Sequence, residues 1–171
     1  MNSNMTPIDW AKRPIQNYAQ FSGRASRPEF WWFFLATIVA GIVARIVDSI
    51  LGIHLVGPIG PLYILLCLAI IVPSIAVSIR RLHDTGRPGW WILLPLVPYI
   101  LAIILGGAAM MGGAASGSAM GVGAGVGLAM IFMLLALVCG ILLIVFYCQA
   151  GTPGDNQYGP NPYGDAGGTT A

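Results

Sequence analysis

The sequence predicts an all-α, polytopic membrane protein with four transmembrane helices, arranged as two helical hairpins with both termini in the cytoplasm. Of its 171 residues, 57% are hydrophobic and only 8% are charged, against about 25% in an ordinary soluble domain. The stretch from Gly89 to Gln149 contains no Asp, Glu, Lys, Arg or His. Because too few polar side chains remain to cover a water-soluble fold, lipid must surround most of the surface.

Four apolar segments are long enough to cross a bilayer, which takes about 20 helical residues. The expected spans are residues 30–53, 62–79, 90–109 and 128–147. These spans form a transmembrane domain over residues 30–148, preceded by a cytoplasmic interfacial segment (residues 1–29) and followed by a cytoplasmic Gly/Pro-rich tail (residues 149–171). In the first segment, Pro14 is expected to start a helical turn.

The connection between the third and fourth spans, residues 106–127, consists mainly of Gly, Ala and Met. Its small residues fit either a flexible hairpin or extensions of both helices, and we expect a hairpin at its centre. Glycines recur at every fourth position, at Gly113, Gly117, Gly121 and Gly125. On a helix they would form a stripe suited to close helix contact, including contact with a second copy of the chain.

The distribution of basic residues predicts the orientation. Four of them precede the first span (Lys12, Arg13, Arg24 and Arg27), and three lie between the second and third (Arg80, Arg81 and Arg87). Four spans with a cytoplasmic N-terminus therefore place seven of the eight basic residues inside, as the positive-inside rule requires. Tryptophan pairs at 31–32 and 90–91 would lie at the same interface, where indole rings anchor helices.

Two segments of the chain, residues 23–32 and 86–91, are similar in sequence. Each places an arginine, a proline and two tryptophans at the start of a span. One interpretation is a repeat of two parallel hairpins related by an axis along the membrane normal, as in some transporters. The other is convergence on one solution for the start of a span at the inner surface.

The densest group of polar residues lies at the predicted inner surface. We call it the cytoplasmic rim; its members are Arg24, Arg27, Glu29, Arg80, Arg81, His83, Asp84 and Arg87. Arginine binds phosphate oxygens in a bidentate manner, and a histidine next to an aspartate titrates near neutral pH. The rim is thus a candidate site for anionic lipid headgroups or a protein partner, and the alternative is a topology signal combined with a tight turn.

Arg45 and Asp48 lie inside the first span, where each charge is costly. At a spacing of three residues they can meet on one face of a helix. Either they extend to the external headgroups, or they form a polar point in the bundle interior that binds or relays an ion.

No catalytic or metal-binding motif stands out. Ser74 and Ser78 lack the sequence surroundings of a catalytic serine, and His54 and His83 fall on opposite sides of the membrane, so they cannot share a metal. We therefore expect no cofactor. The net charge of +2 gives no basic face for nucleic acid.

Three ordered motifs, at residues 21–32, 80–91 and 153–162, resemble the bacterial inner-membrane family called domain of unknown function 805. The resemblance runs from about Trp10 to Pro162, and the long Gly/Ala/Met connection departs from the family's usual pattern. It implies a small plasma-membrane protein and supplies no activity or catalytic residue. It also makes the tail a candidate for docking against the inner loops through Asn156 and Tyr158.

The leading hypothesis is a non-enzymatic inner-membrane protein whose rim binds anionic phospholipid or a protein partner, with a homo-oligomer also open. The alternative is a small transporter or channel component built from the two hairpins. A lipid-modifying enzyme is the third hypothesis.

Overall fold

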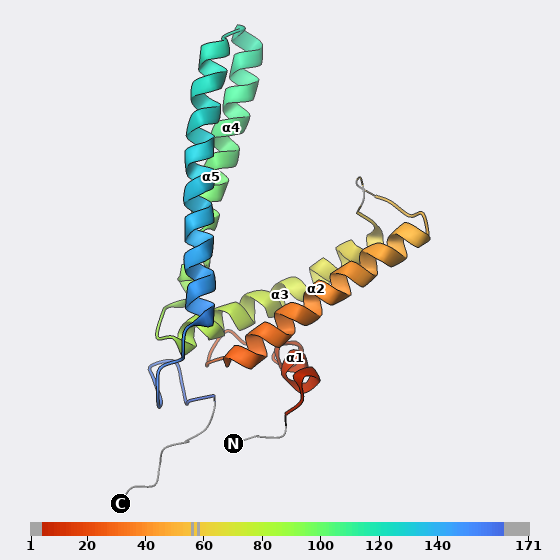
Figure 1. Ribbon diagram of the computed structural model, residues 1–171, viewed down its shortest axis with the longest axis vertical. Coiled ribbons are helices and arrows are strands. Elements are labelled where there is room, and N and C mark those ends of the chain that lie inside the picture. Colours follow the sequence, from red (N-terminus) through yellow and green to blue (C-terminus); the bar gives the residue numbers. More distant parts are fainter. Residues whose placement is uncertain (1–4, 56, 58, 163–171) are drawn as a thin grey trace, which may run out of the picture. The chain divides into compact units, whose positions relative to one another are not determined.

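The computed structural model describes residues 5–55, 57 and 59–162. Over these residues the chain is all-helical, which confirms the predicted fold class. The elements are α1 (Pro7–Gln16), α2 (Arg27–Ile50), α3 (Pro61–Asp84), a short 3-10 helix (Gly89–Leu93), α4 (Leu96–Ser116) and α5 (Ala119–Cys148) (Figure 1). They form two compact units, one from residues 1–89 and 149–171 and the other from residues 90–148.

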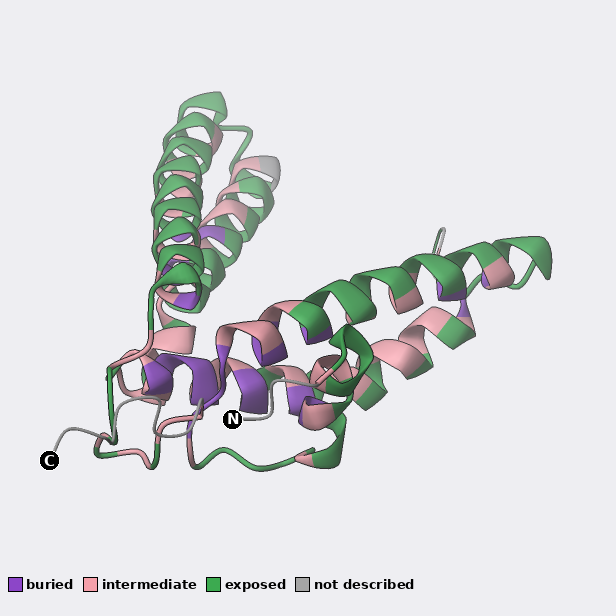
Figure 2. Cartoon of the chain, turned by 60° about the horizontal axis from the view of Figure 1, so that its bottom comes forward, coloured by how far each residue is buried: buried purple, intermediate pink, exposed green. Residues whose placement is uncertain are grey.

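Among the described residues, four helical segments are long and apolar enough to cross a membrane, as predicted: Arg27–Ile50, Pro61–Asp84, Gly89–Gly113 and Ala119–Cys148. Only 11–22% of the residues in the most apolar window of each segment are buried within the protein. Most of their aliphatic side chains are therefore exposed (Figure 2), and a hydrocarbon solvent has to cover them.

Helix α1 begins at Pro7, where the Thr6 hydroxyl caps the backbone N–H of Asp9 and the Asp9 carboxylate accepts the N–H of Thr6. The Thr6 hydroxyl also donates to the Asp9 carboxylate at 2.7 Å, and this hydrogen bond, together with the one from the Thr6 N–H, holds the pKa of Asp9 below its ordinary value. The prediction that Pro14 starts a helical turn was wrong, because Pro14 lies inside α1, after this capping box.

Helices α2 and α3 form a hairpin, and α1 packs against both of them. Pro73 lies inside α3 and has no N–H to offer the carbonyl of Ala69, four residues earlier. The hydroxyl of Tyr18, which follows α1, donates to that carbonyl at 2.6 Å. The N-terminal segment is thereby attached to the middle of α3.

The second unit is a helical hairpin of α4 and α5. Gly117 ends α4 in the left-handed conformation (φ +66°), and α5 starts two residues later. Residues 106–127 therefore form a tight turn with extensions of both helices, and the fourth helix begins at Ala119 instead of Leu128. The helices approach closely here, since a Cβ on Gly125 would overlap the Ala109 side chain and one on Gly113 would overlap Val122. Gly113 and Gly125 thus serve a contact within the chain.

Candidate functional site

Of the six buried charged side chains among the described residues, five gather where α2 begins and α3 ends, and the sixth, Asp48, lies at the other end of α2. We call this group the arginine cluster; it consists of Arg24, Arg80, Arg81, Glu29 and Asp84, each at most 8% exposed. Figure 2 shows burial concentrated at this end of the α2–α3 hairpin. Isolated charges are almost never buried this deeply, so the contacts of each one must be accounted for.

Local sequence brings these residues together. Gly23 takes a left-handed conformation (φ +87°) just before Arg24. Ser26 then caps α2 by accepting the N–H of Glu29, and Pro28 lies in the first turn. The N–H of Ala25 donates to the carbonyl of Arg80 at 3.0 Å, which attaches the start of α2 to the last turns of α3.

Asp84 is the central acceptor of the cluster. Its side chain is fully buried, and its carboxylate receives Nε and Nη2 of Arg24, both at 2.9 Å, and Nη1 of Arg81. Arg24 comes from the segment before α2, whereas Arg81 lies one turn earlier on the same helix as Asp84. Two guanidinium groups thus share one carboxylate.

Arg80 is held differently. Its Nη1 donates to Oε1 of Glu29 at 2.7 Å, while Nε and Nη2 are buried and have no hydrogen-bond partner among the described residues. The Nε–H and one Nη2–H of a guanidinium point in parallel along one edge, the edge that fits two oxygens of a carboxylate or phosphate. Leaving two such donors without an acceptor costs several kcal/mol, by the rule of about 1–3 kcal/mol per buried group.

Arg80 lines a cavity of about 370 Å³, within the range of small-ligand sites. The other walls come from the start of α2, the N-terminal segment and the tail; the lining residues include Glu29, Arg13, Asn17, Gln20, Ser22, Arg24 and Pro160–Pro162. Nη1 of Arg13 lies 3.9 Å from Oε2 of Glu29, so Arg13 adds a third arginine to the lining, beside Arg80 and Arg24. Amide and hydroxyl side chains supply further donors.

The tail packs against the cluster. Arg24 donates from Nη1 to the carbonyl of Gly154 at 2.6 Å and from Nη2 to that of Thr152 at 2.7 Å. The ring of Tyr158 stacks in parallel on His83, with 4.0 Å between ring centres. The side-chain amide of Asn156 donates to the carbonyl of His83 at 3.0 Å. Both tail residues singled out in the sequence therefore contact the end of α3.

The remaining rim residues lie around the cluster. Nε of Arg27 donates to the carbonyl of Gln149 at 2.8 Å, and Nη1 of Arg87 lies 3.4 Å from the carbonyl of Thr85. Nδ1 of His83 lies 3.2 Å from the carbonyl of Gly23. His83 and Asp84, although adjacent in sequence, thus have separate partners.

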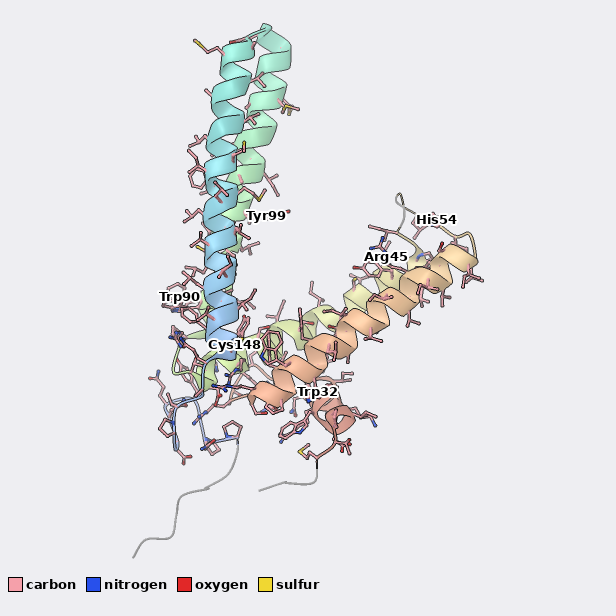
Figure 3. All side chains as sticks on the ribbon, viewed as in Figure 1. Trp32, Arg45, His54, Trp90, Tyr99 and Cys148 are labelled. Carbon is pink, nitrogen blue, oxygen red and sulfur yellow. The ribbon has the colours of Figure 1, made fainter. Side chains whose placement is uncertain are left out.

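Arg45 and Asp48, at the other end of α2, also have separate partners. The buried Asp48 carboxylate accepts the backbone N–H groups of Leu62 and Tyr63 at 3.1 and 3.0 Å. It thereby caps α3, whose own N-cap residue, Gly60, has no side chain. The guanidinium of Arg45 lies over the ring of Tyr63 (5.6 Å), at the end of the hairpin that carries His54 and opposite the end with Trp32 (Figure 3).

The chemistry of the cluster is that of an anion site. Three buried guanidinium groups face two buried carboxylates, which leaves a positive excess. Among the described residues, no group of three or more His, Cys, Asp or Glu side chains is placed to hold a metal ion. Arginine donors bind oxyanions through fixed, paired hydrogen bonds.

The four apolar helices define the class of protein: it is a multi-pass integral membrane protein. Residues 18–160 match the family described as "Protein of unknown function (DUF805)", and the chain belongs to this family. The chain is similar to the inner membrane protein YhaH of Escherichia coli strain K12, with 34% identity over 91% of this chain and 97% of that protein.

A second relative is the inner membrane protein YhaI of the same strain, at 33% identity over 91% of this chain and 96% of that protein. The chain is also similar to the uncharacterized protein YiiR of that strain, with 32% identity over 81% of this chain and 83% of that protein. No solved structure matches the chain. With these relatives and its four apolar helices, the chain is a multi-pass protein of the bacterial inner membrane.

Sequence reasoning missed the contribution of the N-terminal segment. Arg13, Asn17, Gln20 and Ser22 line the Arg80 cavity, but no motif marks them. The available signal was indirect: the segment is amphipathic and basic, and such a segment is expected at the membrane surface on which the rim was also predicted.

Proposed function

We propose that this protein binds the phosphate of an anionic phospholipid headgroup at Arg80, on the cytoplasmic face of the inner membrane. The observation that carries the proposal is the unpartnered bidentate edge of Arg80, buried beside a polar cavity. Two oxygens of one phosphate would satisfy both donors at once.

The position of Arg80 favours a lipid as the source of that phosphate. Arg80 lies about one turn before the end of α3, a helix apolar enough to span the membrane. The end of such a helix lies at the level of the headgroups. The apolar exteriors of α2 and α3 lie next to this end and would contact the acyl chains.

Charge supports the same proposal. The buried cluster carries three cations against two anions, and Arg13 adds a partly exposed cation at the cavity. An anion of charge −1 would neutralise the buried excess. The predicted orientation, based on seven basic residues on one side, assigns this end to the leaflet whose anionic lipids attract basic groups.

The test is lipid retention by the full-length protein. The protein is purified in detergent, and its binding of phosphatidylglycerol, phosphatidate, phosphatidylcholine and inorganic phosphate is measured by native mass spectrometry. Arg80→Lys keeps the charge and can still pair with Glu29, but it loses the forked edge. We expect it to weaken binding of the anionic lipids roughly 10- to 100-fold, the equivalent of about 1.5–3 kcal/mol for a hydrogen bond to a charged group.

The matched control is Arg87→Lys, because Arg87 belongs to the same rim but does not line the cavity. This control should bind as the unmodified protein does. Equal loss in both variants would mean a diffuse electrostatic attraction, and unchanged binding in Arg80→Lys would remove the proposed site. Saturation by inorganic phosphate alone, without a gain from the lipid, would identify a soluble ligand instead.

A further inference from the structure

The first part of the tail forms a compact strap against the arginine cluster. We define the C-terminal strap as residues 149–162, all of which are described. Backbone hydrogen bonds in both directions between Asn156 and Gly159 close a turn in it, and the Asn156 side chain accepts the N–H of Tyr158 at 2.9 Å. A tail with this composition cannot bury an apolar core of its own, so contacts with the rest of the unit must hold it in place.

Backbone carbonyls make most of these contacts. Gln149 accepts from Arg27 and Arg81, and Thr152 and Gly154 accept from Arg24. These acceptors are neutral, so each is a weaker partner for a guanidinium than a charged oxygen would be. The strap therefore occupies arginine donors that an anion could use.

The strap also lines the Arg80 cavity. Its residues Pro160–Pro162 form one wall, and the other walls come from α2, α3 and the N-terminal segment. Helices α2 and α3 are joined at this end by the Arg80–Glu29 pair, and the N-terminal segment is attached to α3 through Tyr18. Because Nε and Nη2 of Arg80 are buried, an anion reaches them only when a wall moves. The strap is held to the rest of the unit by hydrogen bonds that end on neutral carbonyls, including those that Thr152 and Asn156 donate to the carbonyls of Asp84 and His83, and by the ring stack on His83.

We infer that the C-terminal strap is a gate over the Arg80 site, which opens when an anionic headgroup enters and closes when the headgroup leaves. The inference rests on the proposed function and adds its regulation. If the site binds only when the strap is released, the apparent affinity equals the intrinsic affinity multiplied by the fraction of molecules with a released strap. Anything that loosens the strap should therefore tighten lipid binding.

The test uses full-length protein in nanodiscs of phosphatidylcholine, with or without phosphatidate. Hydrogen exchange of peptides covering residues 150–162 reports on the strap, because the N–H groups of Thr152, Asn156 and Gly159 are hydrogen-bonded in the closed form. We expect these peptides to exchange faster with phosphatidate present. This measurement needs no variant, so it holds even if a strap substitution impairs folding.

A variant provides the second arm. Tyr158→Ala removes the stack on His83, and we expect it to tighten phosphatidate binding roughly two- to tenfold, in line with the strength of aromatic stacking. Tyr99→Ala, on the exposed surface of α4, is the matched control and should leave binding unchanged. Adding Arg80→Lys to Tyr158→Ala should abolish the gain.

The outcomes separate the two proposals. Arg80-dependent binding with unchanged or slower exchange in the strap would overturn the gate and keep the lipid site. Weaker binding in Tyr158→Ala would do the same, because the strap would then be part of the binding surface. Absence of Arg80-dependent binding in every variant would overturn both.

Discussion

Asp84→Asn is expected to destabilise the first unit severely. Asparagine fills nearly the same volume but carries no charge, so Arg24 and Arg81 would both lose their buried carboxylate. At an effective dielectric constant of about 20, opposite charges 2.9 Å apart attract by about 6 kcal/mol, before the offsetting cost of desolvation. Breaking a buried pair by removing one partner costs about 3–5 kcal/mol net. We expect a loss in the free energy of unfolding within that range.

The assay is equilibrium unfolding of the full-length protein in mixed micelles with increasing denaturing detergent, followed by tryptophan fluorescence. Asp155→Asn is the matched control, since Asp155 is exposed and its contact is a hydrogen bond from the N–H of Asn161 that asparagine can also accept. The control should change stability by less than about 0.5 kcal/mol. If Asp84→Asn costs no more than the control, Asp84 does not organise the cluster and the reasoning is refuted.

Three further predictions concern other parts of the chain. Asp48→Ala should cost about 0.5–2 kcal/mol by uncapping α3, while Asp48→Asn, which keeps an acceptor, should cost clearly less in the same unfolding assay. Gly125→Ala should cost about 1–3 kcal/mol by overpacking α4 against α5, whereas Gly123→Ala, with open space around it, should be near neutral; equal effects would contradict the close contact. The orientation stays a prediction: a cysteine introduced at His54 should react with an impermeant thiol reagent added to whole cells, and protection of this site would reverse the topology.

Hydropathy was sufficient to predict the four spans, because each helix buries little against the rest of the chain and must therefore be apolar almost throughout. It could not predict where the last helix begins. The residues before Leu128 are small and without a clear period, so their sequence alone does not distinguish a loop from a helix. In the structure, residues 119–127 are helical and pack against α4, as the close approach of Gly125 to Ala109 shows.

The sequence indicated which polar residues are close together, but not which of them pair. His83 and Asp84 are neighbours in sequence, yet successive residues on a helix point about 100° apart. Asp84 therefore meets Arg81, one turn earlier, and Arg24 from another segment, while His83 faces Tyr158. Such pairings depend on contacts between distant segments, which spacing along one helix does not reveal.

The intramembrane residues illustrate the same limit of local spacing. Arg45 and Asp48 are three residues apart and could have met on one face of α2. Asp48 instead caps α3, because the N-terminus of that helix has unpaired N–H groups and its N-cap residue is a glycine. The partner of the Asp48 carboxylate was therefore set by the uncapped N-terminus of α3 and not by the spacing of residues along α2.

The edge of Arg80 can be observed directly in a bilayer. Solid-state NMR that recouples ³¹P and ¹⁵N, on protein labelled at arginine nitrogens and reconstituted with phosphatidate, detects phosphorus only within a few ångströms of a guanidinium. We predict dephasing of one arginine Nε resonance that disappears in Arg80→Lys and persists in Arg87→Lys. Dephasing that is absent, or that is the same in both variants, would contradict a phosphate bound at Arg80.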